Sequence, residues 1–252
     1  MIESLPLAPH LLWLVAGVML LGGFVKGIAG AGLPLVAISM LGTFIDPRQG
    51  VAIVAIPVVL SNIWQSLRSG VMLSAGRRFG GLIIGFVLMT WVGANLLVIM
   101  PTAALLGIVG LVAIVFSGLN LMDPNWVLPS RFERTAGPLV GLGSGLLNGL
   151  TTVNGPPILM YLLSLGLQKD KLVGSYGLIA FAGAVPLLIS YIVVGLMGPS
   201  EILLSTMALI PTFAGLLLGE KLRRFIDPHR FRQMLLIVLI VLGANLLRRA
   251  LT

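Results

Sequence analysis

Long apolar runs recur along the whole chain, and many approach the roughly 20 residues that span a bilayer as a helix. Hydrophobic residues make up 58% of the 252 residues and charged residues only 10%. A soluble domain carries about 25% charged residues, and its core could not bury this much apolar surface. The runs are continuous rather than alternating, which disfavours a β-barrel. The composition therefore predicts an all-α polytopic membrane protein, with the lipid bilayer as a partner.

Several other classes are excluded or disfavoured by composition. The chain has no cysteine, which excludes disulfides, thiol catalysis and cysteine-ligated metals. The net charge of +8 fits loop Lys and Arg that set membrane orientation, so we expect no nucleic-acid partner. No GxxxxGK[ST] loop is present, so we expect no ATP-driven transport by this chain and no cofactor.

The acidic residues and histidines give no sign of a metal or catalytic site. All eight carboxylates and both histidines fall in loops or at segment ends. A proton- or cation-coupled pump normally places such a group inside the membrane. We therefore expect neither a metal site nor a catalytic pair, and no proton relay.

The apolar runs divide the chain into two similar halves. The first half, residues 1–122, contains a paired segment over 10–45, joined at GAGLP, and helices over 49–66, 79–100 and 102–122. A polar linker, 123–136, follows. The second half, 137–252, contains a paired segment over 137–167, joined at VNGPP, and helices over 172–197, 200–219 and 231–248. Residues 1–10 carry no Lys or Arg, so we expect a retained first helix rather than a secretory signal.

The two halves also match residue by residue, which indicates an internal repeat. An offset of 122 places Gly23 on Gly145, Lys26 on Asn148, Gly27 on Gly149, Gly32 on Asn154 and Pro34 on Pro156.

Positive charges predict the orientation of these halves, because Lys and Arg favour cytoplasmic loops. With a periplasmic N-terminus, the cytoplasmic side, including the linker, receives 12 of the 16 Lys and Arg, namely Arg68, Arg77, Arg78, Arg131, Arg134, Lys169, Lys171, Lys221, Arg223, Arg224, Arg230 and Arg232. Five passes per half is an odd number, so the halves form inverted repeats, each a re-entrant hairpin plus three transmembrane helices. A segment count that is wrong by one would make the repeat parallel.

The paired segments predict the position of the breaks. In the second pair, 137–167, two legs of about 15 residues rise only about 22 Å each, less than the roughly 30 Å hydrocarbon core. We expect each pair to enter the membrane and return, with GAGLP and VNGPP near the midplane. Non-helical backbone at that depth survives only where protein buries it or water reaches it.

Such breaks offer groups that can bind an anion. A helix that begins after a break directs unpaired N–H groups and a partial positive charge at its surroundings. Asparagine and threonine side chains add donors, and glycines let the backbone approach a ligand. The predicted substrate-binding residues are Lys26, Gly30, Gly32, Pro34, Asn148, Thr151, Thr152, Asn154, Gly155 and Pro156. The alternative is that the breaks are tight packing turns.

Lys26 is the only ionisable residue well inside an apolar segment. Intramembrane charges are costly and usually face a cavity or a partner. We expect Lys26 to attract an anionic substrate. The alternatives are that it reaches a membrane surface, or that it neutralises a helix C-terminus at the GAG break.

Two motifs resemble those of a known family. GFVKGIAGAGLPLVAISML at 23–41 and GLLNGLTTVNGPPILMYLL at 145–163 resemble the two glycine- and proline-rich motifs of the sulfite exporter TauE/SafE family. The commoner family pattern has a run of glycines before the proline, whereas AGL precedes Pro34 here and VNG precedes Pro156. The resemblance covers essentially the whole chain. It implies a multi-pass permease of the bacterial inner membrane that moves small sulfur-containing anions, such as sulfite or organosulfonates.

Two other functions stay open at this point. A membrane scaffold or assembly factor would use the polar breaks only for packing. An intramembrane enzyme would need a nucleophile–base pair or a metal cluster, which the sequence does not display. The sequence sets no oligomeric state.

Overall fold

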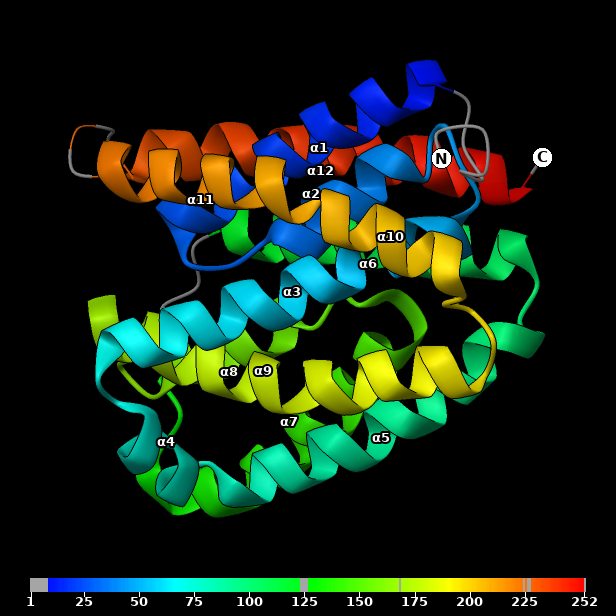
Figure 1. Ribbon diagram of the computed structural model, residues 1–252. Coiled ribbons are helices and arrows are strands. Elements are labelled where there is room, and N and C mark those ends of the chain that lie inside the picture. The colour runs from blue at the N-terminus through cyan, green and yellow to red at the C-terminus, as the bar shows by residue number, and fades with distance from the viewer. Residues whose placement is uncertain (1–8, 123–126, 168, 224, 226–227, 252) are drawn as a thin grey trace. The chain divides into compact units, whose positions relative to one another are not determined.

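The computed structural model describes residues 9–122, 127–167, 169–223, 225 and 228–251, and these residues form helices with short connections and no strand (Figure 1). The helices are α1 Pro9–Ala29, α2 Leu33–Leu41, α3 Pro47–Ser69, α4 Met72–Arg78, α5 Gly80–Ile99, α6 Thr102–Leu121, α7 Ser130–Thr151, α8 Gly155–Ser164, α9 Lys169–Val193, α10 Pro199–Met207, α11 Leu209–Leu222 and α12 Pro228–Leu251. The predicted all-α class is confirmed.

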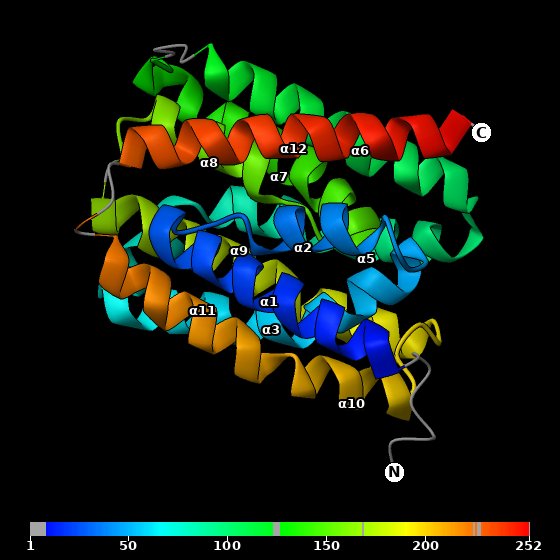
Figure 2. The same cartoon turned by 90° about the horizontal axis from the view of Figure 1, so that it is seen from above.

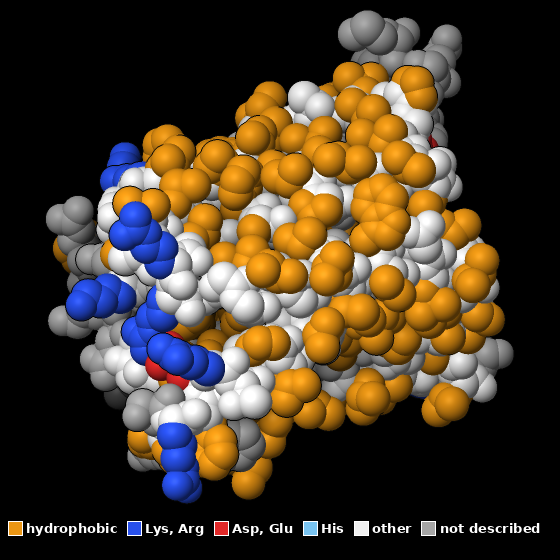
Figure 3. Space-filling model, turned by 90° about the horizontal axis from the view of Figure 1, so that it is seen from below, with side chains coloured by type: hydrophobic (Ala, Val, Ile, Leu, Met, Phe, Trp, Pro, Cys, Tyr) orange, Lys and Arg blue, Asp and Glu red, His pale blue; other side chains and the backbone are white. Residues whose placement is uncertain are grey.

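Six helical stretches in the described residues are long and apolar enough to cross a membrane. They are Leu11–Ala29, Pro47–Ser69, Gly80–Ile99, Thr102–Leu119, Lys171–Val193 and Pro199–Leu222. Figure 3 shows the matching surface: hydrophobic side chains cover most of this face, and Lys and Arg gather at one edge. Apolar side chains in contact with lipid cost nothing in a bilayer, so this surface fits a multi-pass membrane protein.

The helices form two compact units. Unit 1 consists of Met1–Pro57, Met100–Asp123 and Gly195–Thr252, and unit 2 consists of Val58–Ile99 and Pro124–Val194. Each unit draws helices from both predicted halves of the chain. The units therefore do not coincide with the predicted repeats.

In unit 1, α1 lies along α11 and α12 lies along α6 (Figure 2). Glycines make the first of these contacts possible. A Cβ atom on Gly27 would lie 2.3 Å from Leu216 O, and one on Gly219 would lie 2.3 Å from Phe24 O. Larger residues at these positions would force the helices apart, so the close approach of the two backbones requires glycine, as is common between membrane helices.

In unit 2, α7 lies along α5 in a similar way. A Cβ atom on Gly149 would lie 2.3 Å from Thr90 O, and one on Gly93 would lie 2.5 Å from Leu146 O. Helix α9 packs on α5 at Gly183, where a Cβ atom would lie 2.0 Å from Phe86 Cε1. Unit 2 thus also depends on glycine for its closest helix contacts.

The two glycine contacts correspond to each other in register. Gly149 comes 122 residues after Gly27, and their partners Gly93 and Gly219 are 126 residues apart. The backbone atoms nearest these glycines follow the same two offsets: Leu216 O, Glu220 N, Phe24 O and Ile28 N in unit 1 correspond to Thr90 O, Ala94 N, Leu146 O and Leu150 N in unit 2. The α1–α11 and α7–α5 pairs therefore share one packing arrangement.

The predicted short first leg is wrong for the second pair, 137–167. Helix α7 has 22 residues and α1 has 21, which at 1.5 Å per residue is about 32 Å, enough to cross the hydrocarbon core. Only α2, with nine residues, and α8, with ten, are short. The predicted second pair begins at residue 137, but Pro129 has extended backbone and the helix starts at Ser130. Charged residues there belong to the helix, so the end of the predicted linker 123–136 is helical.

Two further boundaries differ from expectation. The predicted loop 67–78 contains α4, because α3 continues to Ser69 and a new helix starts at Met72. The predicted helix 200–219 is divided at Ala208 into α10 and α11. Pro211 lies in the first turn of α11 and has no N–H to donate to Met207 O, which explains the division.

The glycine contacts give a testable prediction on α7. Gly145→Ala places a Cβ atom 2.4 Å from Phe86 O, so we expect overpacking to cost about 1–3 kcal/mol of stability. Gly143→Ala on the same helix meets nothing within 4 Å and serves as the matched control. Thermal unfolding in detergent measures both variants. Equal stability of the two would contradict the packing described here.

Candidate functional site

The second break lies between α7 and α8 in unit 2. Helix α7 ends at Thr151, and Thr152 follows with φ of 59°, the only positive φ of a non-glycine residue in the described chain. Left-handed backbone is costly for a β-branched residue. Local bonds hold it: Thr152 N donates to Asn148 O at 2.7 Å, and Val153 N donates to Thr151 Oγ1 at 3.2 Å.

Two buried asparagines organise this break. Asn154 Nδ2 donates to Asn148 Oδ1 at 2.7 Å, and Asn148 Nδ2 donates to Thr90 Oγ1 on α5 at 3.1 Å. Tyr176 OH on α9 donates to Asn154 Oδ1 at 2.9 Å. Both asparagine side chains are fully buried, so each bond avoids the cost of an unpaired polar group in an apolar environment. The break is therefore tied to both α5 and α9.

All three tyrosines of the chain bind the α7–α8 hairpin. Besides Tyr176, Tyr191 OH donates to Gly149 O at 3.0 Å and lies 3.3 Å from Thr152 Oγ1. Tyr161 OH donates to Glu133 O at 3.0 Å and joins α8 to the start of α7. Leu128 N also donates to Ser164 O at 2.9 Å. The hairpin thus begins and ends at the same side of unit 2.

The start of α8 carries fewer backbone donors than an ordinary helix. Pro156 and Pro157 are its second and third residues and have no N–H. Gly155 is therefore the only residue among its first three that can donate to a ligand. The Asn154 side chain makes no capping bond to α8 and belongs to the asparagine network instead.

The first break lies between α1 and α2 in unit 1. Gly30 and Gly32 have φ of 81° and 101°, which requires glycine, and Gly30 N donates to Lys26 O at 2.8 Å. Pro34 is the second residue of α2, so Leu33 and Leu35 keep their N–H groups in its first turn. This break therefore offers more backbone donors than the second.

Lys26 lies in the last turn of α1 and is only 1% exposed. The alternative that it reaches a membrane surface is wrong for this structure. A buried cation near a helix C-terminus gains from the helix dipole, and it also makes the region attractive to an anion.

The two breaks coincide in register. Helices α1 and α7 end at Ala29 and Thr151, and helices α2 and α8 begin at Leu33 and Gly155, so both boundaries are 122 residues apart. The offset found in the sequence therefore also relates the ends of the helices. Lys26 and Asn148 occupy the same place, three residues before the helix end.

The structure places the predicted residues in two groups. Lys26, Gly30, Gly32 and Pro34 belong to unit 1, whereas Asn148, Thr151, Thr152, Asn154, Gly155 and Pro156 belong to unit 2. All are buried or half-buried except Pro156, whose side chain lies outside the described part. Sequence reasoning missed Thr90, Tyr176 and Tyr191. The signal was the rarity of tyrosine, since a buried phenol in an apolar helix needs a hydrogen-bond partner.

Comparison with protein families gives a match to Sulfite exporter TauE/SafE over residues 15–246. The chain belongs to the sulfite exporter TauE/SafE family. The match begins in α1 and ends in α12, so it includes both breaks. Comparisons with curated proteins and with solved structures gave no significant match. As a TauE/SafE protein, the chain is a membrane transporter of the sulfite exporter type, which confirms the resemblance seen in its motifs.

The asparagine network predicts how removal of the Tyr176 hydroxyl changes the stability of the protein. Tyr176→Phe leaves the buried Asn154 Oδ1 without this donor, so we expect a loss of about 1–3 kcal/mol. Ser144→Ala is the control, because Ser144 Oγ is buried and has no partner among the described residues. Removing it should leave stability unchanged or raise it. Unfolding of both variants in the same detergent provides the test, and an equal loss in the two would contradict the network.

Proposed function

We propose that this TauE/SafE protein moves a small sulfur-containing oxyanion, sulfite or an organosulfonate, and that each helix break supplies groups that bind it. The observation that carries the proposal is the buried polar residue before each break, Lys26 in unit 1 and Asn148 in unit 2. An apolar segment that buries a lysine at an interruption of its helix favours the approach of an anion.

The groups at the two breaks have different roles in this proposal. At the first break, Lys26 supplies positive charge. The N–H groups of Leu33 and Leu35, in the first turn of α2, supply hydrogen-bond donors. At the second break, Gly155 N–H and the one spare hydrogen of the Asn154 amide supply hydrogen bonds. Tyr176 OH holds Asn154 in place, so the amide of Asn154 acts as a positioned donor.

We further propose that the two halves, 1–122 and 137–252, are inverted repeats. The equal offsets of the helix ends and the matching glycine contacts support this proposal. So does the composition of the units, in which the first helix of each half packs on a helix of the other half. Such exchange is expected when two similar halves associate around a two-fold axis.

The basic loops support a cytoplasmic assignment for one end of unit 2. Arg78 on α4 pairs with Glu133 on α7, which joins the predicted cytoplasmic loop 67–78 to the linker 123–136. Lys171 lines a cavity with Ser74 and Arg78. Three loops predicted to face the cytoplasm thus lie together, and we propose that the bacterial inner membrane holds the protein with this end inside and the N-terminus in the periplasm.

A comparison of sulfite transport by the unaltered protein and by the Lys26→Met variant tests the proposal. We expect saturable uptake of radiolabelled sulfite into proteoliposomes by the unaltered protein, and a loss of about tenfold or more in the variant, since a charged hydrogen bond contributes about 1.5–3 kcal/mol. Lys221→Met is the matched control, because Lys221 is exposed near the end of α11. Excess organosulfonates and sulfate as competitors rank the substrates.

The same assay separates the scaffold alternative. A scaffold predicts flux at the rate of empty liposomes and tolerance of Lys26→Met. Normal flux in Lys26→Met would contradict the role of this lysine and leave the first break as packing. The unfolding temperature of each variant, measured in parallel, shows whether a loss of flux reflects a loss of structure.

A further inference from the structure

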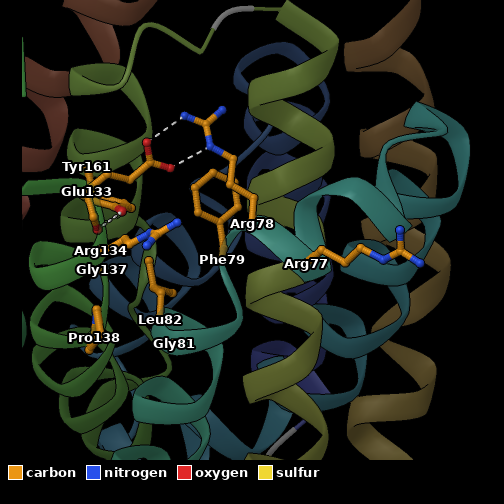
Figure 4. Close-up of a pocket in the computed structure, with 10 residues that line it drawn as sticks. All are labelled: Arg77, Arg78, Phe79, Gly81, Leu82, Glu133, Arg134, Gly137, Pro138 and Tyr161. Atoms are coloured by element: carbon orange, nitrogen blue, oxygen red, sulfur yellow. Dashed lines mark hydrogen bonds and ion pairs between the residues drawn. The ribbon is translucent and has the colours of Figure 1, made fainter. Parts of the chain in front are cut away.

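A basic cavity lies in unit 2, far from the second break. It has a volume of about 430 Å³, within the range of about 300–1,000 Å³ that is usual for ligand sites. It is formed by the end of α4, the start of α5, the start of α7 and Tyr161 on α8 (Figure 4). None of residues 151–156 lines the cavity, and Arg134 precedes Thr151 by 17 residues on α7, which is about 25 Å of helix. The cavity is therefore a separate feature of the unit.

Charge in the cavity is unbalanced. Three arginines line it, Arg77, Arg78 and Arg134, against the single carboxylate of Glu133. That carboxylate is already engaged, because Arg78 Nε and Nη2 donate to its two oxygens at 2.6 and 3.1 Å. The hydrogen bond from Arg78 lowers the pKa of Glu133, and the charge of Arg134 adds to the effect. Glu133 therefore stays ionised at neutral pH and neutralises only one of the arginines.

Arg134 is the uncommitted cation of the cavity. It makes no hydrogen bond or ion pair with the described residues, and Figure 4 shows it extending from α7 toward the α5 side, near Phe79. Arg77 extends away from this space in the same view. Arg78 uses two of its five donors on Glu133 and keeps the others. Two guanidinium groups can thus donate to one ligand.

The remaining walls carry no charge and include two aromatic rings. Phe79 and Tyr161 pack edge to face with their centroids 6.3 Å apart, and Arg78 stacks on Phe79. A Cβ atom on Gly137 would lie 3.1 Å from Tyr161 Oη, so glycine keeps this side open. Planar guanidinium groups match oxyanions such as phosphate or sulfonate.

We propose that this cavity is a second anion site, which binds a small oxyanion through Arg134 and Arg78 at the basic end of unit 2. The ligand chemistry is a phosphate- or sulfonate-type group with several anionic oxygens. Such a group comes either from a free anion on its way to the transport path or from the headgroup of an anionic phospholipid. The proposal does not depend on the substrate assigned to the helix breaks.

Binding of inorganic phosphate to the purified full chain in neutral detergent tests the proposal. We expect saturable binding by calorimetry, weakened about tenfold in Arg134→Gln, because one charge-assisted bond to the anion is lost. Arg131→Gln is the matched control: Arg131 lies three residues before Arg134 on α7, is exposed and does not line the cavity. It changes the net charge equally and should leave binding intact.

Two results would overturn the proposal. Equal weakening by Arg131→Gln and Arg134→Gln would show attraction by the general positive field of the loops. Phosphate binding that is lost in Lys26→Met and kept in Arg134→Gln would place the anion at the first helix break. Binding kept in Lys26→Met and lost in Arg134→Gln supports the cavity whether or not the transport proposal holds.

A lipid comparison then identifies the source of the anion. Phosphate binding is measured with the protein in nanodiscs of phosphatidylcholine alone and in nanodiscs that also contain phosphatidylglycerol. Competition from phosphatidylglycerol that disappears in Arg134→Gln supports a headgroup as the ligand. Phosphate affinity that is equal in both lipid mixtures, and still sensitive to Arg134→Gln, supports a free anion.

Discussion

A helix that breaks in an apolar environment leaves polar groups that must find partners within the protein or in a ligand. This requirement explains the architecture around both breaks. In unit 2, Asn154 donates to Asn148. Asn148 also donates to Thr90 on α5, and Asn154 accepts from Tyr176 on α9. Tyr191 donates to the last turn of α7. The packing of α5, α7 and α9 therefore serves one need, which is to hold a polar turn in a fixed conformation.

Glycine provides the second constraint. Polar side chains on neighbouring helices meet only when the helix backbones approach closely. Gly149, next to Asn148 on α7, and Gly93 on α5 allow this approach. Gly27 and Gly219 do the same beside Lys26. The two units thus present one arrangement with different chemistry, a cation in one and an amide in the other. In the proposed function, the first would attract an oxyanion and the second would give it directed hydrogen bonds.

Much of this arrangement could be predicted from the sequence, because hydropathy and internal duplication are properties of the chain itself. The membrane class, the helix breaks at residues 30–32 and 152–154, and the equivalence of Lys26 and Asn148 came from pattern alone. The length of α7 did not, because charged residues at its start resemble a loop although they continue the helix. The tyrosine partners were also missed. Tyr176 and Asn154 lie 22 residues apart, and no periodicity reports a contact between separate helices.

The central claim is that the second break is reached by water and by the transported anion rather than serving as a dry packing turn. The chain contains no cysteine, so a single Gly155→Cys substitution introduces the only thiol. Labelling of this thiol by N-ethylmaleimide in intact vesicles, with and without methanesulfonate, is the most direct measurement. We predict that the Gly155→Cys thiol is labelled and that methanesulfonate slows this labelling. A Leu150→Cys control, at a buried position of α7, should stay unlabelled. A Gly155→Cys thiol as unreactive as the buried control would contradict the account.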